Sequence, residues 1–168
     1  MQKGNWKYDI IEAGYKCNMT DMSAAIGLIE LERYDNDTLV RRKHIVNSYN
    51  EILKKYAWAD LPVHEIAADK TESCYHLYPL RIKGITEAQR DEIMQHVFNK
   101  DVSVNVHFIP LPMLSFYRNQ GYSISNYPNT YAHFANEITL PVFYNLTNEQ
   151  VKEVSNALIS GVEAVLNK

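Results

Sequence analysis

A lysine, a cysteine and an asparagine lie directly before a predicted helix, in the stretch GYKCNMTD at residues 14–21. Backbone N–H groups in the first turn of a helix have no helical partner, so they form an anion site. Lys16 would add a positive charge to that site, and Asn18 would add amide donors. The stretch therefore predicts an anion-binding loop. The alternative is an ordinary loop in which Thr20 caps the helix.

Two histidines are the other candidate functional side chains. His76 lies in a predicted strand between tyrosines, where the alternative is a half-buried, hydrogen-bonded sheet residue. His107 stands where a predicted strand ends and a Pro-rich loop begins, a common place for functional side chains, although a lone loop histidine is usually structural. The sequence has no glycine-rich phosphate loop, no Gly-x-Ser-x-Gly elbow and no Cys-x-x-Cys or His-x-x-x-His pair. We therefore expect no metal site and assign no catalytic residue.

Composition excludes several classes of partner. The 168 residues carry a net charge of −3, and the one basic cluster, at residues 41–43, is too short for a nucleic-acid interface. No apolar run approaches the roughly 18–20 residues that span a bilayer, and the first residues contain no apolar leader. Two cysteines make neither a disulfide framework nor a metal pattern. We expect a cytoplasmic protein that binds neither nucleic acid nor membranes.

Hydrophobic periodicity predicts helices separated by a few short strands. Helices are expected at 20–33, from residue 39 to about 56, after capping boxes at Thr86 and Thr147, and at 128–134. Four turn formers at 35–38 are expected to interrupt the first two helices. Strands are expected at 73–82, 102–106 and 137–141, with Pro79 placing the first at a sheet edge or bulge. The fold class is therefore α+β, with a small, mainly antiparallel sheet covered by helices.

The helix at 20–33 is apolar over more than one face. Its large apolar side chains, which spread around the helix, are Met22, Ile26, Leu28, Ile29 and Leu31. A globular domain usually needs only one apolar stripe per helix. We therefore expect this helix to be packed on more than one side, either inside the domain or against something outside it.

Four segments resemble one enzyme family. GYKCNMTDMSAAIGLIELERYD resembles the segment that DegT/StrS-type sugar aminotransferases write as Gly-Tyr-Asn-Tyr-Arg-Met followed by an Ala-rich helix. YHLYPLRI resembles the family's His-Leu-Tyr strand, VHFIPLPMLSFYR its Val-His-Tyr-x-Pro stretch, and ITLPVFYNLTNEQV its closing Leu-Pro segment. The four matches keep the family's order from about residue 8 to residue 151.

This resemblance implies the C-terminal, small domain of a fold-type I pyridoxal 5'-phosphate (PLP) aminotransferase. It implies that Lys16 and Asn18 help to hold the cofactor phosphate of the neighbouring subunit in a homodimer, and that His76 and His107 lie at the nucleotide-sugar cleft. The chain departs from the family's pattern at Lys16, Cys17 and Asn18, which replace Asn, an aromatic residue and Arg. Phe108 stands where the family often has Tyr, which weakens a catalytic role there.

The resemblance also implies a missing partner. The family's cofactor-binding lysine lies in a Ser-x-x-x-x-Lys segment of a large N-terminal domain, which this chain lacks. We expect one domain, 1–168, in which 1–35 packs on the large domain or a partner subunit and 36–168 forms the α+β core. The complete enzyme would aminate a nucleotide-linked keto-sugar with an amino donor, in polysaccharide or amino-sugar biosynthesis, and this chain alone would be inactive. The alternative is a non-enzymatic, free-standing dimerisation or interaction module with the same fold.

Overall fold

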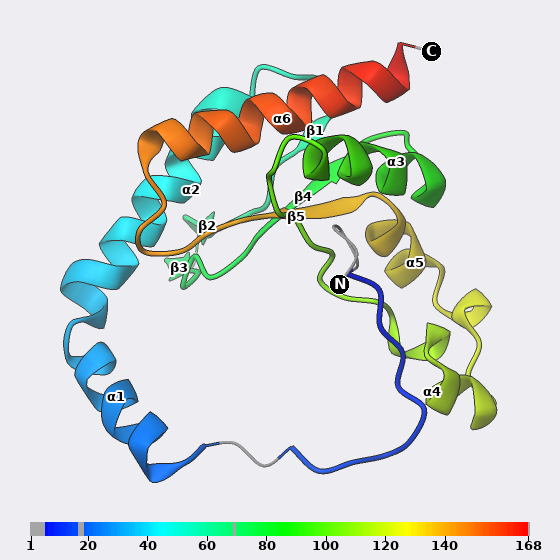
Figure 1. The fold of residues 1–168 in the computed structure, drawn as a ribbon, viewed down its shortest axis with the longest axis horizontal. Coiled ribbons are helices and arrows are strands. Elements are labelled where there is room, and N and C mark those ends of the chain that lie inside the picture. The colour runs from blue at the N-terminus through cyan, green and yellow to red at the C-terminus, as the bar shows by residue number, and fades with distance from the viewer. Residues whose placement is uncertain (1–5, 17–18, 69, 168) are drawn as a thin grey trace.

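The computed structural model describes residues 6–16, 19–68 and 70–167, in which helices alternate with short strands (Figure 1). The helices are α1 (Asp21–Glu32), α2 (Leu39–Leu53), α3 (Glu87–Phe98), α4 (Ser115–Asn119), α5 (Pro128–Ala135) and α6 (Asn148–Leu166). The strands are β1 (Ala59–Asp60), β2 (Glu65–Ile66), β3 (Thr71–Glu72), β4 (Tyr78–Ile82) and β5 (Glu137–Leu140). This mixture confirms the predicted α+β class.

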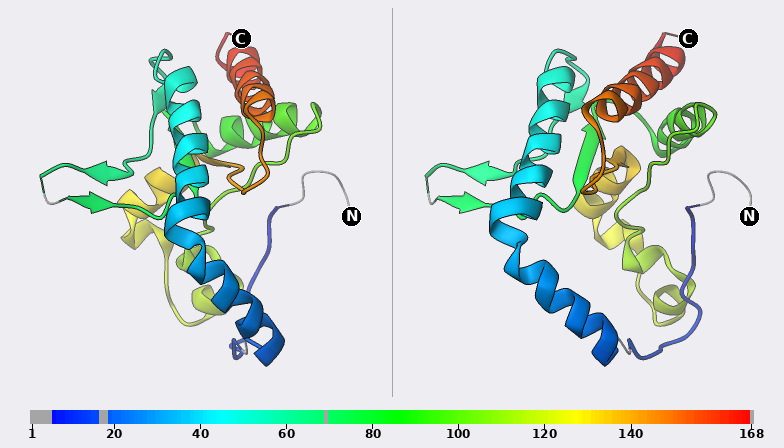
Figure 2. Two further views of the ribbon diagram at one scale, coloured as in Figure 1. Left: turned by 90° about the vertical axis from the view of Figure 1, so that its left-hand side faces the viewer. Right: turned by 60° about the vertical axis from the view of Figure 1, so that its left-hand side comes forward.

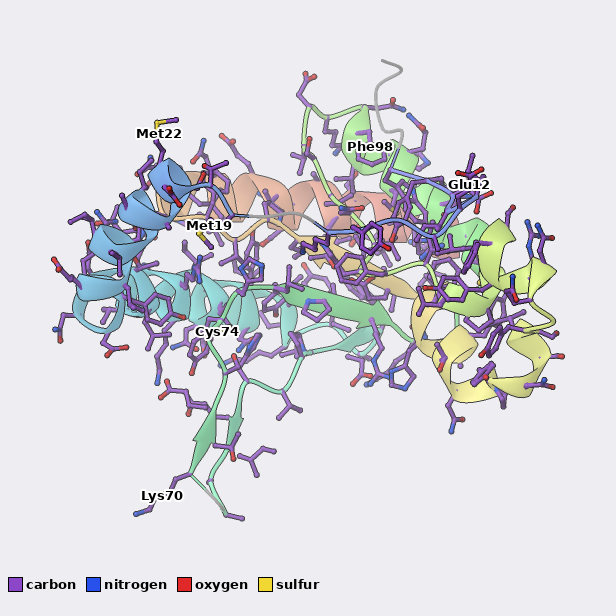
Figure 3. The ribbon with its side chains drawn as sticks, turned by 90° about the horizontal axis from the view of Figure 1, so that it is seen from below. Glu12, Met19, Met22, Lys70, Cys74 and Phe98 are labelled. Atoms are coloured by element: carbon purple, nitrogen blue, oxygen red, sulfur yellow. The ribbon has the colours of Figure 1, made fainter. Side chains whose placement is uncertain are left out.

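The main sheet is small and antiparallel, with strand order β1-β4-β5. β4 pairs with β5 so that Tyr78 lies opposite Leu140 and Arg81 lies opposite Glu137. β2 and β3 form a separate antiparallel pair. Figure 3 shows this hairpin projecting from the body of the molecule, with Lys70 at its tip.

The two faces of the main sheet differ in chemistry because side chains alternate along each strand. One face carries the apolar side chains of β4 and β5, which are Tyr78, Leu80, Ile82, Ile138 and Leu140. These side chains form the hydrophobic core together with residues of α2, α3 and α6. Those three helices cover this face (Figures 1 and 2). The opposite face carries Pro79, Arg81, Glu137 and Thr139. Residues 78–82 of the strand expected at 73–82 are therefore confirmed as a strand, and its second face carries polar side chains.

Helices α3 and α6 both begin at the predicted capping boxes. In α3 the Thr86 side chain accepts from the Gln89 backbone and the Gln89 side chain accepts from the Thr86 backbone, and Thr147 and Gln150 repeat the arrangement in α6. α3 and α6 pack closely at Gly161, where an added Cβ would lie 3.2 Å from the backbone oxygen of Ile93. These two helices pack on each other and on the apolar face of the main sheet.

The expected break at residues 35–38 is wrong. A π-helical turn, Tyr34–Thr38, joins α1 to α2. The backbone N–H of Leu39 donates to the oxygen of Tyr34, five residues earlier, so the turn formers remain helical. The Tyr144 hydroxyl also donates to Asp37 at 2.7 Å, a tertiary contact that the local sequence does not reveal.

Two strand predictions also need correction. The stretch 102–106 forms only an isolated bridge between Asn105 and Thr139, and residues 73–77 lie outside any strand. Pro79 lies in the central strand rather than in an edge strand, which the pattern did not predict. The proline is tolerated because β1 pairs only with Arg81 and Ile82 and ends before reaching it.

α1 extends away from the rest of the described chain, continuing beyond α2 (Figures 1 and 2). None of its residues is buried, and the Met22 side chain points outward in Figure 3. By contrast, Trp6 packs against the core, and the N–H of Phe116 donates to the oxygen of Ile10 at 2.7 Å. Within the described residues, no helix combines the length and apolar character needed to cross a membrane.

Candidate functional site

An open pocket of about 720 Å³ lies on the polar face of the main sheet. Pro79, Arg81 and Glu137 reach it from the strands, and His107 reaches it from the segment that follows the bridge at Asn105. The remaining lining residues come from the end of β1 and the segment after it, the Pro-rich loop and α5: Asp60, Leu61, Pro62, Val63, Phe108, Pro110, Asn129, Thr130, His133 and Phe134. The pocket therefore combines apolar walls with a few polar groups, as small-molecule sites do.

His107 is held by two hydrogen bonds to β5. Its backbone N–H donates to Glu137 Oε2 at 3.0 Å, and its ring Nδ1 lies 2.9 Å from Thr139 Oγ1. Partial burial, assisted by the nearby His76, lowers the pKa of His107 below its usual value. The imidazole is therefore neutral near pH 7.

Glu137 is a buried carboxyl group, only 5% exposed. Burial raises the pKa of Glu137 to about 7, although the hydrogen bonds from Thr139 and His107 and the charge of Arg90 oppose the rise. The Thr139 hydroxyl donates to Glu137 Oε1 by a short hydrogen bond. Glu137, Thr139 and His107 thus form one connected polar network.

Two arginines anchor the surroundings of this network. Arg81 forms an ion pair with Asp60, and its Nη1 lies 3.0 Å from His133 Nε2, so β4, β1 and α5 meet at the pocket. Arg90 is fully buried in α3, where its Nη1 donates to the backbone oxygens of Phe134, at 2.7 Å, and Glu137, at 3.3 Å.

The Arg90 guanidinium also lies close to two aromatic rings that contact each other. Its Cζ is 5.0 Å from the Trp6 ring centroid and 4.8 Å from that of Phe134. Both distances suit cation–π attraction. Because Arg90 bonds the backbone oxygens of Phe134 and Glu137, this cluster holds the start of the strand that carries Glu137.

The structure treats the two predicted substrate-binding histidines differently. His107 lines the pocket, as expected of a substrate-binding side chain. His76 is exposed, precedes β4 instead of lying within a strand, and is absent from the pocket lining, although its charge acts on His107. A substrate-binding role for either residue stays a prediction.

The two predicted cofactor-binding residues lie before α1. Lys16 is described and exposed, whereas Asn18 lies outside the described residues. Thr20 caps α1, because its Oγ1 accepts from the N–H of Ser23 at 3.4 Å. This cap leaves the N–H groups of Asp21 and Met22 without helical partners. Free N–H groups at a helix start suit an anion, and a cofactor-binding role for Lys16 and Asn18 stays a prediction.

Sequence reasoning missed most of the pocket. From the sequence, Glu137, Thr139 and Arg81 are predicted only as members of strands. One local signal could have identified Glu137: it is a charged residue within a short apolar strand that ends at Leu140-Pro141. Among the described residues, no three His, Cys, Asp or Glu side chains gather as metal ligands would.

Comparison with known proteins identifies the family. The DegT/DnrJ/EryC1/StrS aminotransferase family matches residues 1–159. The chain belongs to this family. The resemblance seen in its four sequence segments is thereby confirmed.

Relatives within the DegT/DnrJ/EryC1/StrS family are much longer than this chain. SpsC of Bacillus subtilis, named a spore coat polysaccharide biosynthesis protein, is 30% identical over 161 residues, which cover 92% of this chain and 40% of SpsC. MJ1066 of Methanocaldococcus jannaschii is 34% identical over 158 residues, which cover 93% of this chain and 40% of that protein. The chain thus spans about 40% of the length of these relatives.

A solved structure shows the same fold. Spr1654 of Streptococcus pneumoniae, named a sugar aminotransferase, superimposes in its PMP-form with a TM-score of 0.82 at 38% identity. The superposition covers 99% of this chain and 41% of Spr1654, and a PLP-form of Spr1654 is also solved. The fold is therefore that of one part of a PLP aminotransferase of this family.

Proposed function

We propose that this chain is the C-terminal domain of a PLP-dependent aminotransferase that acts on a nucleotide-linked keto-sugar in polysaccharide or amino-sugar biosynthesis. Family membership and the fold shared with Spr1654 support the reaction class. The name of SpsC supports a role in polysaccharide synthesis. Since the chain spans about 40% of its relatives, the remainder of the enzyme supplies the covalent cofactor anchor.

The observation that carries this proposal is the exposed apolar surface of α1. Met22, Ile26 and Leu31 are 79%, 67% and 69% exposed, and α1 has no buried residue at all. Exposed apolar patches of this kind mark interaction surfaces in folded proteins. In the complete enzyme, α1 packs on the large domain or on the partner subunit of a homodimer, whereas Trp6, within the expected 1–35 segment, packs against the core of this domain.

The loop before α1 contributes to the cofactor site. Lys16, Asn18 and the first N–H groups of α1 would hold the phosphate of PLP, which supplies the electron sink for amino transfer when bound. No lysine of this chain lies in the family's lysine-bearing segment. The chain alone therefore binds no PLP covalently and transfers no amino group.

The pocket on the sheet receives part of the nucleotide-sugar. Its walls include apolar side chains, and the neutral imidazole of His107 forms a hydrogen bond with a substrate hydroxyl. Arg81 adds positive charge that Asp60 partly offsets, so it orients an anionic group without binding it strongly. His76, outside the pocket, would contact a more distant part of the same substrate.

A chimera tests the proposal. This chain would replace the matching C-terminal part of Spr1654, and the visible absorbance of lysine-bound PLP would be measured in the chimera and in the 168-residue chain. We expect the absorbance in the chimera only. A chain that shows it alone, or a folded chimera that lacks it, would contradict the proposal.

Two variants that introduce a negative charge test whether α1 is the surface that packs on the rest of the enzyme. Leu31→Asp on α1 should prevent assembly of the chimera, whereas Lys152→Asp, at an exposed position of α6, should not. A chain that self-associates through α1 but never supports PLP binding in the chimera would favour the alternative, a free-standing interaction module.

A further inference from the structure

The network at the pocket contains one hydroxyl that must serve two neighbours. Thr139 Oγ1 lies between Glu137 Oε1, to which it donates, and His107 Nδ1, at 2.9 Å. The other carboxylate oxygen, Glu137 Oε2, accepts from the backbone N–H of His107 at 3.0 Å. The same residue therefore holds both the backbone and, through Thr139, the ring of His107.

Proton counting fixes the direction of these bonds. A threonine hydroxyl has one hydrogen, and an ionised carboxylate can only accept. Once Thr139 gives its hydrogen to Glu137, its oxygen can only accept from the imidazole of His107. Nδ1 must then carry the ring hydrogen, and in the neutral ring Nε2 is left with a free lone pair.

We propose that Glu137, acting through the Thr139 hydroxyl, is a positioning residue that sets the tautomer of His107 and makes Nε2 a hydrogen-bond acceptor for a ligand in the pocket. A ligand group with a proton to donate, such as a hydroxyl, matches this acceptor. The tautomer assignment rests on this chain alone, and only the choice of a sugar hydroxyl rests on the proposed function.

A neutral side chain at position 137 reverses the network. The His107 backbone N–H still needs an acceptor at Oε2, so any hydrogen on the side chain of residue 137 must face Thr139. Thr139 then accepts from residue 137 and donates to His107 Nδ1, and the ring hydrogen moves to Nε2. Protonated Glu137 and a glutamine at this position both have this effect.

Other charged or titratable groups act on the network from each neighbouring element. Arg90 of α3 reaches the backbone oxygen of Glu137, and Arg81 of β4 lies opposite it in the sheet. His133 of α5 and Asp60 of β1 contact Arg81, and His76, before β4, acts on His107. None of these groups bonds to Thr139 Oγ1 in the described structure, so the relay itself has only three members.

Nitrogen NMR of the imidazole rings tests the proposal on the 168-residue chain. Two-bond ¹⁵N–¹H correlation spectra distinguish Nδ1–H from Nε2–H rings, and His107→Gln identifies the signal among the six histidines. At pH 8 we expect His107 in the Nδ1–H form in the parent and in the Nε2–H form in Glu137→Gln. An unchanged tautomer in a folded Glu137→Gln protein would overturn the proposal.

A second pair of variants covers the case in which Glu137→Gln does not fold. Thr139→Ser keeps the hydroxyl and should keep the Nδ1–H form, whereas Thr139→Val removes the relay and should lose it. Equal tautomers in these two variants would overturn the proposal as well. These measurements need neither PLP nor the rest of the enzyme. The tautomer assignment can therefore fail while the proposed function stands, and the proposed function can fail while the tautomer assignment stands.

Discussion

α1 and β5 depart from the usual distribution of residues in opposite directions. α1 exposes a set of large apolar side chains, including Leu28 at 64%, whereas β5 buries the carboxyl group of Glu137 at 5% exposure. Within the domain, Glu137 has partners: Thr139, the backbone of His107, and Arg90 through the strand backbone. Among the described residues, α1 has no comparable set of partners that would bury its apolar side chains.

The difference separates two kinds of functional feature. A buried polar group is tolerated when hydrogen bonds within the same domain satisfy it, so its role can be inferred from the domain itself. An exposed apolar helix is explained only by something that covers it. β5 therefore reports on the chemistry of the pocket, and α1 reports on the rest of the enzyme.

The largest expected effect compares leucines in two helices. Leu158 of α6 is fully buried, so Leu158→Ala should lower the free energy of unfolding by about 2–5 kcal/mol. Leu28→Ala in α1 should change it by less than about 0.5 kcal/mol, because that side chain is exposed. Denaturant unfolding of both variants measures the difference, and equal losses would show that α1 is packed in the isolated chain.

The pH dependence of stability tests the titration of Glu137 in β5. Because the pKa of Glu137 is raised from 4.5 to about 7, the folded chain holds a proton that the unfolded chain has released between these pH values. The free energy of unfolding should therefore fall as pH rises across this window, by at most about 3 kcal/mol, and level off above it. Glu137→Gln should remove this slope.

Comparing Glu137→Gln with the parent separates the contribution of Glu137 to the pH dependence of stability from the contributions of other titratable groups. His107 and His64 have lowered pKa values, so their contributions to stability are lost as pH falls below about 6.5, in the opposite direction. The parent and Glu137→Gln share the contribution of His64, which lies outside the network of Glu137, Thr139 and His107. If the two stability curves run parallel from pH 4.5 to 7, Glu137 does not titrate as described.

Retention of PLP tests the role of the loop before α1. In the Spr1654 chimera, Asn18→Ala should raise the dissociation constant of PLP about tenfold to a hundredfold, as expected for losing a charge-assisted hydrogen bond of roughly 1.5–3 kcal/mol. Lys16→Ala should do less, because solvent screens an exposed ammonium group. Equilibrium dialysis measures both constants, and a larger effect of Lys16→Ala would reverse the assignment.

The smallest expected effect uses two helical glycines. An added Cβ at Gly27 of α1 meets nothing within 4 Å, so Gly27→Ala should stabilise the chain by up to about 1 kcal/mol through helix propensity. At Gly161 the same Cβ would lie 3.3 Å from His96 Cβ in α3, and overpacking of roughly 1–3 kcal/mol should exceed that gain. Thermal unfolding should therefore shift in opposite directions.

The sequence predicted the elements whose signals are local. The capping boxes at Thr86 and Thr147 and the Thr20 cap place the starts of α3, α6 and α1 correctly, because the capping side chain and its target are three residues apart. The apolar excess of α1 predicted packing on more than one side, inside the domain or against something outside it, and the described structure buries none of its residues. His107 was identified as a candidate because it follows a predicted strand.

The missed features depend on contacts between distant segments. The helix continues through residues 34–38, where Asp37 accepts from Tyr144, over one hundred residues away. The segment 102–106 contributes only the bridge from Asn105 to Thr139, on the edge of β5 that does not pair with β4. The role of Glu137 requires His107, 30 residues earlier, and no local pattern brings these two residues together.

Hydrogen exchange of the α1 amides tests most directly whether this helix belongs to an interface with the rest of an aminotransferase. Exchange would be followed by mass spectrometry in the 168-residue chain and in the Spr1654 chimera, with the amides of α6 as an internal reference. In the isolated chain, α1 should exchange far faster than α6, and in the chimera its protection should approach that of α6. Equally fast exchange of α1 in both proteins would contradict the proposal that the large domain or partner subunit covers it.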